Sequence, residues 1–111
     1  MDMILRNELE NGEVELDVRG PINSEVVGEF RTALYAEVEA AGTTTVLLNL
    51  ERVGAINSAA IGVLVSAHRK AAEKGKTFRI SECNDHLRRT LLMFRLDRII
   101  SMPGGSSAPP S

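Results

Sequence analysis

Residues 46–65 constrain the fold of this chain more than any other stretch. They open with an apolar run, residues 46–50, that has the length and the valine- and leucine-rich composition of a buried strand. A short loop follows, and Asn57 then stands where its side chain can accept hydrogen bonds from the first free N–H groups of a helix. We therefore expect a strand-loop-helix unit in which Ser58 lies at the helix N-terminus.

The N-terminal residues predict a β-hairpin. Residues 3–8 and 13–19 have strand character, and the Asn11-Gly12 pair between them is a common hairpin turn. In the second strand apolar and charged residues alternate, which predicts one buried face and one solvated face. The inward residues are Val14, Leu16 and Val18, and the outward residues are Glu13, Glu15, Asp17 and Arg19.

A first helix is predicted after the loop at residues 20–23, capped by Asn23 or Ser24 and ended by Gly42. Its apolar residues recur at spacings of three and four, whereas its charged residues fall outside that stripe and are expected to face solvent. The stripe consists of Val27, Phe30, Leu34, Val38 and Ala41, and the charged face of Glu29, Arg31, Glu37 and Glu39.

The middle of the chain predicts a central strand and a second helix. Residues 44–50 lack strict alternation, as is typical of a strand that is covered on both faces. The helix extends from Ser58 to about Lys74, where Gly75 ends it. Its first half is apolar or small nearly all round, which indicates either an unusually buried helix or a surface patch for docking.

The last third of the sequence predicts a strand at residues 76–81, a helix capped by Asn84 or Asp85, and a short strand at residues 98–102. The buried stripe of this third helix is expected to consist of Leu87, Leu91 and Phe94, assisted by Leu92. Together the elements predict an α/β fold: a single domain with a mixed, mainly parallel sheet and packed helices, in the order βαβαβαβ preceded by an N-terminal strand.

Length and composition limit the possible classes. A chain of 111 residues suffices for one domain, expected at residues 1–102, while the Pro-, Gly- and Ser-rich residues 103–111 predict a disordered tail. The net charge of -2 supplies no basic field for nucleic acid. A single cysteine, Cys83, excludes an internal disulfide and favours a cytoplasmic location. No export signal or membrane-spanning stretch is expected.

Residues 46–65 resemble the signature of the STAS domain of bacterial anti-sigma factor antagonists. In that family a hydrophobic strand is followed by a loop and by Asp-Ser-Ser-Gly-Leu-Gly opening a helix; here residues 57–62 read Asn-Ser-Ala-Ala-Ile-Gly. The serine that the family phosphorylates aligns with Ser58, and its second glycine with Gly62. Asn57, Ala59 and Ala60 depart from the pattern.

The resemblance implies a partner-switching regulator. The unmodified protein would bind an anti-sigma factor that is also a serine kinase of the histidine-kinase-like ATPase type, phosphorylation of Ser58 would release it, and a metal-dependent serine phosphatase would restore it. A non-phosphorylated interaction module of a transporter or scaffold is the alternative, because Asn57 lacks the family's carboxylate. The expected partner-binding residues are Gly20, Pro21, Ile22, Asn23, Asn57, Ser58, Ala59, Ala60, Ile61 and Gly62, together with the loop at residues 51–56.

An enzymatic function has little support in the sequence. Ser58 and His68 lie ten residues apart on one helix, which separates their backbones by roughly 15 Å. No glycine-flanked nucleophile elbow surrounds Ser58, and no glycine-rich phosphate loop is present. Two histidines, His68 and His86, and one cysteine have no recognisable metal-ligand spacing. We therefore expect neither catalysis nor a cofactor or metal, and Cys83 is expected to be a small packed residue.

Overall fold

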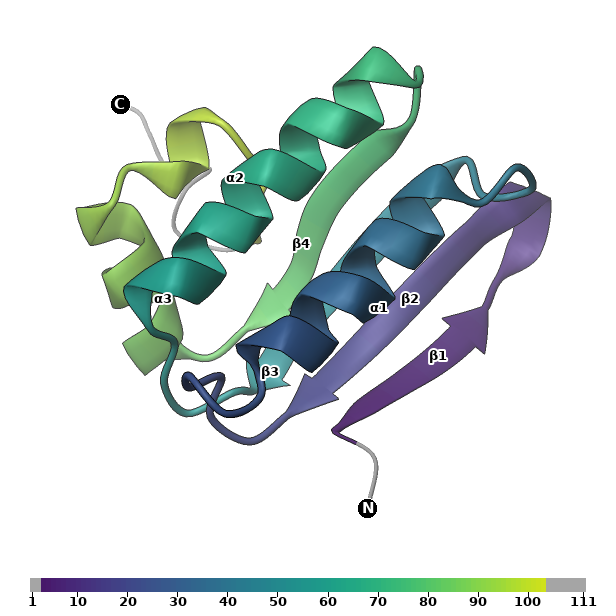
Figure 1. Cartoon of the computed structure of the whole chain (residues 1–111). Helices are drawn as coiled ribbons and strands as arrows, with labels where there is room; N and C mark the ends of the chain where they lie inside the picture. Colours follow the sequence, from purple (N-terminus) through teal and green to yellow (C-terminus); the bar gives the residue numbers. More distant parts are fainter. Residues whose placement is uncertain (1–2, 104–111) are drawn as a thin grey trace.

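The computed structural model describes residues 3–103, which form a four-stranded sheet and three α-helices (Figure 1). The elements in chain order are β1 (Ile4–Glu8), the 3-10 turn η1 (Glu10–Gly12), β2 (Glu13–Arg19), α1 (Val27–Glu39), β3 (Thr45–Arg52), α2 (Ser58–Glu73), β4 (Thr77–Cys83), α3 (Asp85–Met93) and the 3-10 turn η2 (Leu96–Arg98). The tail predicted at residues 103–111 lies outside the described residues except for Pro103.

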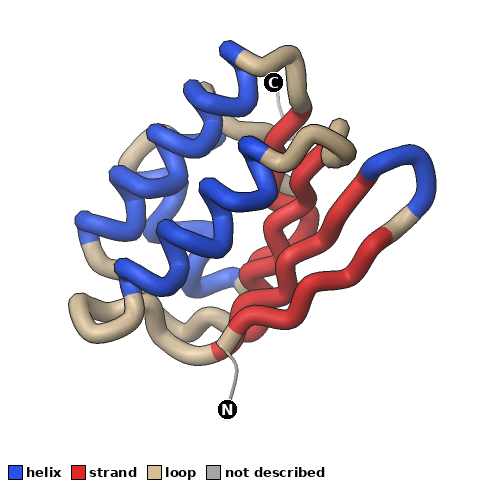
Figure 2. Tube along the Cα trace, turned by 45° about the vertical axis from the view of Figure 1, so that its right-hand side comes forward, coloured by secondary structure: helices blue, strands red, loops and turns tan. Residues whose placement is uncertain are grey.

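The strands lie in the order β1-β2-β3-β4. β1 pairs antiparallel with β2, whereas β2-β3 and β3-β4 are parallel pairs, so the sheet is mixed and mainly parallel as predicted. β3 is an internal strand, also as predicted. Each parallel strand lies beside the one before it, and right-handed crossovers in one direction place α1 and α2 on the same face of the sheet. Figure 2 shows the helices gathered on that face.

The prediction that β3 is covered on both faces is wrong. Val46, Leu48 and Leu50 are buried beneath the helices, but none of the helices within residues 3–103 covers the opposite face of the sheet. Leu47 lies on that open face and is shielded by its cross-strand neighbours Glu15 and Arg79. An apolar side chain at the centre of a sheet can thus be buried by the long side chains beside it, without a second layer.

The predicted strand at residues 98–102 is absent. Its place is taken by η2 and by one isolated bridge between Arg79 and Ser101. Leu96 and Ile100 are both buried, and the N–H of Ile100 donates to the carbonyl of Leu96 at 2.7 Å. These two residues are four apart, and the helical turn that this hydrogen bond closes places both side chains on one face, toward the core.

The third helix ends one residue before its expected stripe does. Leu87 and Leu91 are buried as predicted, but Phe94 is half exposed because it is the C-cap of α3 and the chain turns away at Arg95. Leu96 and Ile100 fill the core instead.

The first helix also ends differently from the prediction. Ala41 is exposed beyond its end, and Gly42 does not adopt a positive φ. The ammonium of Lys76 closes the helix end by donating to the carbonyls of Val38 and Ala40.

Two acidic residues that were expected to face solvent are buried. The carboxylate of Glu37 accepts hydrogen bonds from the Arg6 guanidinium and from Thr43 Oγ1, the latter at 3.2 Å. This carboxylate, together with that of Glu8, raises the pKa of Arg6 above its usual value. Asp17 is likewise buried, with its Oδ2 near Arg19 at 3.4 Å and near Arg52 at 3.6 Å. Alternation alone does not reveal burial by a charged partner from another element.

The side chain of Asn84 joins α3 to the end of β3 and to the loop that follows it. Its Oδ1 accepts a hydrogen bond from the N–H of Leu87 at 2.8 Å, which makes Asn84, rather than Asp85, the N-cap of α3. Its Nδ2 donates to the carbonyls of Glu51 at 3.0 Å and Val53 at 2.9 Å. One amide therefore caps a helix and holds the neighbouring loop.

We predict that Gly12→Ala destabilises the protein by at least about 1–2 kcal/mol. Gly12 has φ 79°, and an added Cβ would lie 2.8 Å from the carbonyl oxygen of Gly42. Urea unfolding measures the loss. Gly28→Ala is the matched control, because an added Cβ there meets no heavy atom within 4 Å and alanine favours the helix. Equal unfolding free energies for the two variants would contradict the prediction.

We predict opposite effects for the same substitution at two helix caps. Asn84→Asp keeps the cap but removes two donors and turns a carboxylate toward two carbonyls, so unfolding free energy should fall by about 1–3 kcal/mol. Asn57 uses its side-chain Oδ1 to cap α2, and Asn57→Asp should leave stability unchanged or raise it by about 0.3–1 kcal/mol. Chemical denaturation of both variants decides, and a loss at position 57 as large as at position 84 would refute the stated role of Asn84.

Candidate functional site

The carboxyl ends of β2 and β3 and the start of α2 meet at one edge of the sheet. We call this surface the carboxyl rim and define it as residues 20–23, 51–57 and 58–62. Backbone hydrogen bonds join the first two segments: Gly20 N–H donates to the carbonyl of Arg52 at 3.0 Å, and Ile22 N–H to that of Ala55 at 2.9 Å. Asn57 N–H donates to the carbonyl of Ile22 at 3.1 Å. The structure thus brings the predicted site segments together.

The loop after β2 is shaped by Gly20 and Asn23. Gly20 has φ 84°, a conformation that disfavours other residues, and it turns the chain toward the β3-α2 loop. Asn23 does not cap α1 directly, because α1 begins at Val27 with Val26 in the cap position. Instead, Asn23 Oδ1 accepts from Glu25 N–H at 2.9 Å and stabilises the turn before the helix. Ser24 does not cap α1 either.

Ser58 is the first residue of α2 and is exposed. Asn57 Oδ1 accepts from Ala60 N–H at 2.8 Å, and the Asn57 carbonyl accepts from Ile61 N–H at 3.1 Å. Within residues 3–103, no acceptor is hydrogen-bonded to the N–H groups of Ser58 and Ala59. Two free donors therefore stand beside the Ser58 hydroxyl at the positive end of the helix dipole, an arrangement that favours an anion.

The expected site residues differ in how far they reach the surface. Ile22, Ala60 and Ile61 are buried in the core. Pro21, Asn23, Ser58, Ala59 and Gly62 are exposed, and Gly20 and Asn57 are partly exposed. The exposed part of the first α2 turns is small and uncharged, so another protein could approach it closely without desolvating a charge. Gly62 has open space around it, because a Cβ added there would meet no heavy atom within 4 Å.

Sequence reasoning missed two features next to the carboxyl rim. One is the double role of Asn84, which holds residues 51–53 of the rim. The other is buried Asp17, whose Oδ1 has no hydrogen-bond partner within the described residues and whose Oδ2 faces Arg19 and Arg52. Neither feature had a local sequence signal. The contacts of Asn84 are with residues more than thirty positions away. The surroundings of Asp17 depend on the register shift at the end of β2.

Cys83 is packed in the core, as predicted. Cys83 is buried, and this burial raises the pKa of its thiol, an effect that Arg88 opposes. In the part of the chain that the structure describes, no group of three or more His, Cys, Asp or Glu side chains could hold a metal ion. Across residues 3–103, no helix has the length and apolarity required to cross a membrane.

Comparison with known proteins identifies the family by one match and the fold by several others. Residues 5–102 match the family model described as "Mlab, STAS domain". No curated protein sequence matches the chain significantly. Several solved structures share its fold at low sequence identity.

The structural relatives include regulators and a transporter domain. An anti-sigma factor antagonist from Mycobacterium paratuberculosis is 18% identical with a TM-score of 0.80, covering 91% of this chain and 84% of that one. The Bacillus cell fate determinant SpoIIAA in its phosphorylated form is 14% identical with a TM-score of 0.70, covering 92% of each chain. The STAS domain of a SulP transporter from Vibrio cholerae is 15% identical with a TM-score of 0.62, covering 92% of this chain and 80% of that one.

These likenesses show the fold, and the family match extends from the first strand to the residues after η2. Within that span, Asn57 caps α2 and Ser58 is its first residue. The chain belongs to the STAS domain family.

Proposed function

We propose that the chain is an anti-sigma factor antagonist or a similar partner-switching regulator that binds its partner through the carboxyl rim. The observation that carries this proposal is the position of Ser58, exposed at the N-terminus of α2 beside two free N–H groups. The partner is an anti-sigma factor with serine kinase activity of the histidine-kinase-like ATPase type. The STAS family consists of non-enzymatic binding modules, so the partner supplies the nucleotide and the chemistry.

A phosphate on Ser58 would affect the fold and the interface differently. It adds about -1.5 to -2 charge at pH 7, which the free N–H groups of Ser58 and Ala59 can stabilise. A docked partner would instead face a dianion on a surface that was small and uncharged. The free energy needed to desolvate that charge without a counter-ion exceeds the free energy that the helix N-terminus contributes by binding it. Phosphorylation therefore releases the partner, and a serine phosphatase in the same cytoplasm restores binding.

A second function, constitutive binding as a module of a transporter or scaffold, is favoured by two observations. The fold is shared with the STAS domain of a SulP transporter. Asn57 keeps the cap of α2 through its amide oxygen, but it offers no carboxylate to orient the Ser58 hydroxyl. In this function the carboxyl rim is still the docking surface and Ser58 remains unmodified.

Two substitutions of Ser58 should separate fold from binding. Ser58→Asp should keep or raise the melting temperature, since an anion at a helix N-terminus contributes about 0.3–1 kcal/mol. It should also lower partner affinity at least tenfold, whereas Ser58→Ala should bind normally and resist regulation. Calorimetric titration with the cognate anti-sigma factor kinase measures the affinities. If Ser58→Asp binds as tightly as the parent, and the kinase with ATP forms no phosphoserine, the switch is refuted. The constitutive module is then the function that remains.

Substitution of Gly62 by a larger residue should weaken partner binding without lowering stability. Gly62→Ala should raise the unfolding free energy by about 0.5–1 kcal/mol, because the site is open and alanine favours a helix. Gly62→Gln should remain folded and should weaken partner affinity by blocking close approach. Ala72→Gln is the matched control, because Ala72 is exposed near the far end of the same helix. Equal affinities for the two glutamine variants would exclude the start of α2 from the interface.

A further inference from the structure

The end of α3 and the turn after it expose an apolar surface. We define the α3 patch as Leu92, Met93, Phe94 and Ile99, four large hydrophobic residues that lie within eight positions of the chain and are all exposed. Met93 is 80% exposed and Phe94 is 51% exposed. Neighbouring Leu87, Leu91, Leu96 and Ile100 already supply the core contacts of this segment. The exposed residues are therefore not required to hold α3 in place.

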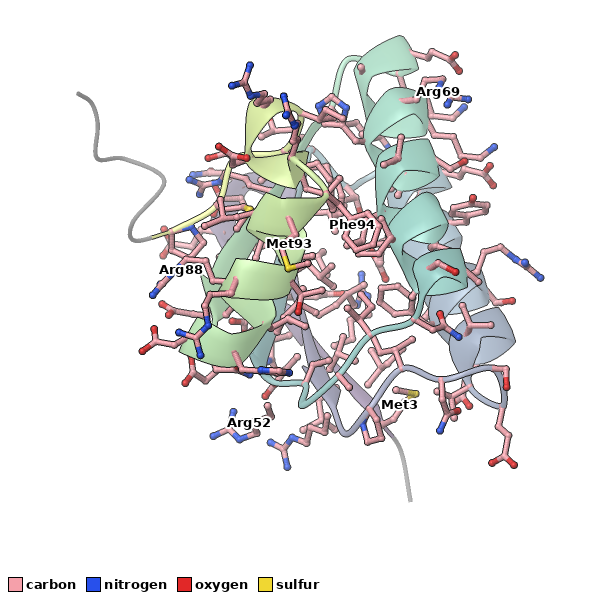
Figure 3. All side chains as sticks on the ribbon, turned by 90° about the vertical axis from the view of Figure 1, so that its left-hand side faces the viewer. Met3, Arg52, Arg69, Arg88, Met93 and Phe94 are labelled. Atoms are coloured by element: carbon pink, nitrogen blue, oxygen red, sulfur yellow. The ribbon has the colours of Figure 1, made fainter. Side chains whose placement is uncertain are left out.

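Figure 3 shows how the two most exposed residues are directed. Phe94 lies between α3 and α2, whereas Met93 lies on the outer side of α3. The two side chains thus lie on different sides of α3, one toward α2 and the other outward. Exposed apolar side chains of this kind can contact the apolar face of another helix.

The charges around the α3 patch have one dominant sign. The segment from Asp85 to Ile99 contains four arginines, two aspartates and no lysine, a formal charge of +2, whereas the whole chain carries -2. Arg88 pairs with Asp85. Within residues 3–103, Arg89, Arg95 and Arg98 form no ion pair with another side chain. Three exposed arginines therefore remain available to an acidic partner.

Arg95 occupies a backbone position that would suit glycine better. It has φ 59° and ψ 32°, directly after the C-cap of α3, where helices commonly use glycine. A left-handed conformation costs a residue with a Cβ roughly 1–2 kcal/mol. The strain places a cation next to Phe94, and strain of this kind is concentrated at functional positions.

We propose that the α3 patch is a docking site for an acidic amphipathic helix of a protein partner. The apolar face of that helix would lie on Phe94 and Met93, and its carboxylates would pair with Arg89, Arg95 and Arg98. Exposed aromatic, methionine and arginine residues without lysine are the composition of a protein interface. The proposal does not depend on Ser58 or on the switch proposed above.

Two other occupants fit the observations less well. A second copy of the chain docked symmetrically would bring the unpaired arginines of both copies together, and like charges across an interface are unfavourable. An anionic membrane would attract the arginines, but Phe94 is directed toward α2 instead of outward into lipid.

The experiment titrates the ¹⁵N-labelled full chain with a synthetic helical peptide of about 15 residues that has leucines on one face and glutamates elsewhere. The expected result is a set of amide shifts in residues 88–99 and the facing side of α2. A peptide with lysine in place of glutamate should bind at least tenfold more weakly. The double variant Met93→Ser and Phe94→Ser should bind the acidic peptide at least tenfold more weakly. The control Leu9→Ser, at an exposed leucine of the hairpin, should leave the affinity unchanged.

Arg95→Gly keeps the test independent of folding. This variant should raise the unfolding free energy while lowering affinity for the acidic peptide several-fold. The proposal is overturned if the acidic peptide does not bind, if the lysine peptide binds equally well, or if Leu9→Ser weakens binding as much as the patch variant. It is also overturned if the patch residues instead mediate a dimer in sedimentation, or binding to phosphatidylglycerol vesicles.

Discussion

The winding of the parallel strands in one direction determines most of this structure. β2, β3 and β4 lie side by side in chain order, and each crossover is a helix. Because such crossovers are right-handed, both helices must lie on one face, and all parallel strands must deliver their carboxyl ends to one edge. The start of α2 lies at that edge because the helix follows β3 after a short loop. The handedness of the crossovers therefore places Ser58 at this edge of the sheet. Local capping by Asn57 then fixes Ser58 as the first residue of α2.

The predictions that succeeded depend mostly on local interactions. Asn57 as a cap, Gly75 with φ 71° at the end of α2, and the β1-β2 hairpin all depend on residues that are near in sequence. Such interactions are visible in a sequence window. The hairpin loop is the three-residue turn Glu10–Gly12 instead of the two-residue turn predicted at Asn11-Gly12. The internal position of β3 was also predictable, because a run such as Val46 to Leu50 is too apolar for an edge.

The errors share a different cause, which is the contribution of distant residues. Glu37 is buried because Arg6 reaches it from β1, and Leu47 is shielded by side chains of two other strands. The covering of β3 was mispredicted because the apolar run was taken to require two layers. Phe94 and the last strand were mispredicted because the end of α3 was placed from spacing, whereas Arg95 in a left-handed conformation determines it. The identity of the partner proposed for the carboxyl rim could not be predicted, because it depends on a second protein rather than on contacts within this chain.

The contrast between the hairpin and the crossovers also has a consequence for the order in which the chain acquires structure. The β1-β2 hairpin closes over one short turn, so its pairing requires little loop entropy. Pairing β2 with β3, or β3 with β4, first requires an entire helix to be spanned. Contacts that are distant in sequence form slowly, and we therefore expect the hairpin to form early and the parallel pairs to limit the folding rate. The carboxyl rim, which exists only when β2 and β3 are aligned, is accordingly among the last surfaces that folding creates.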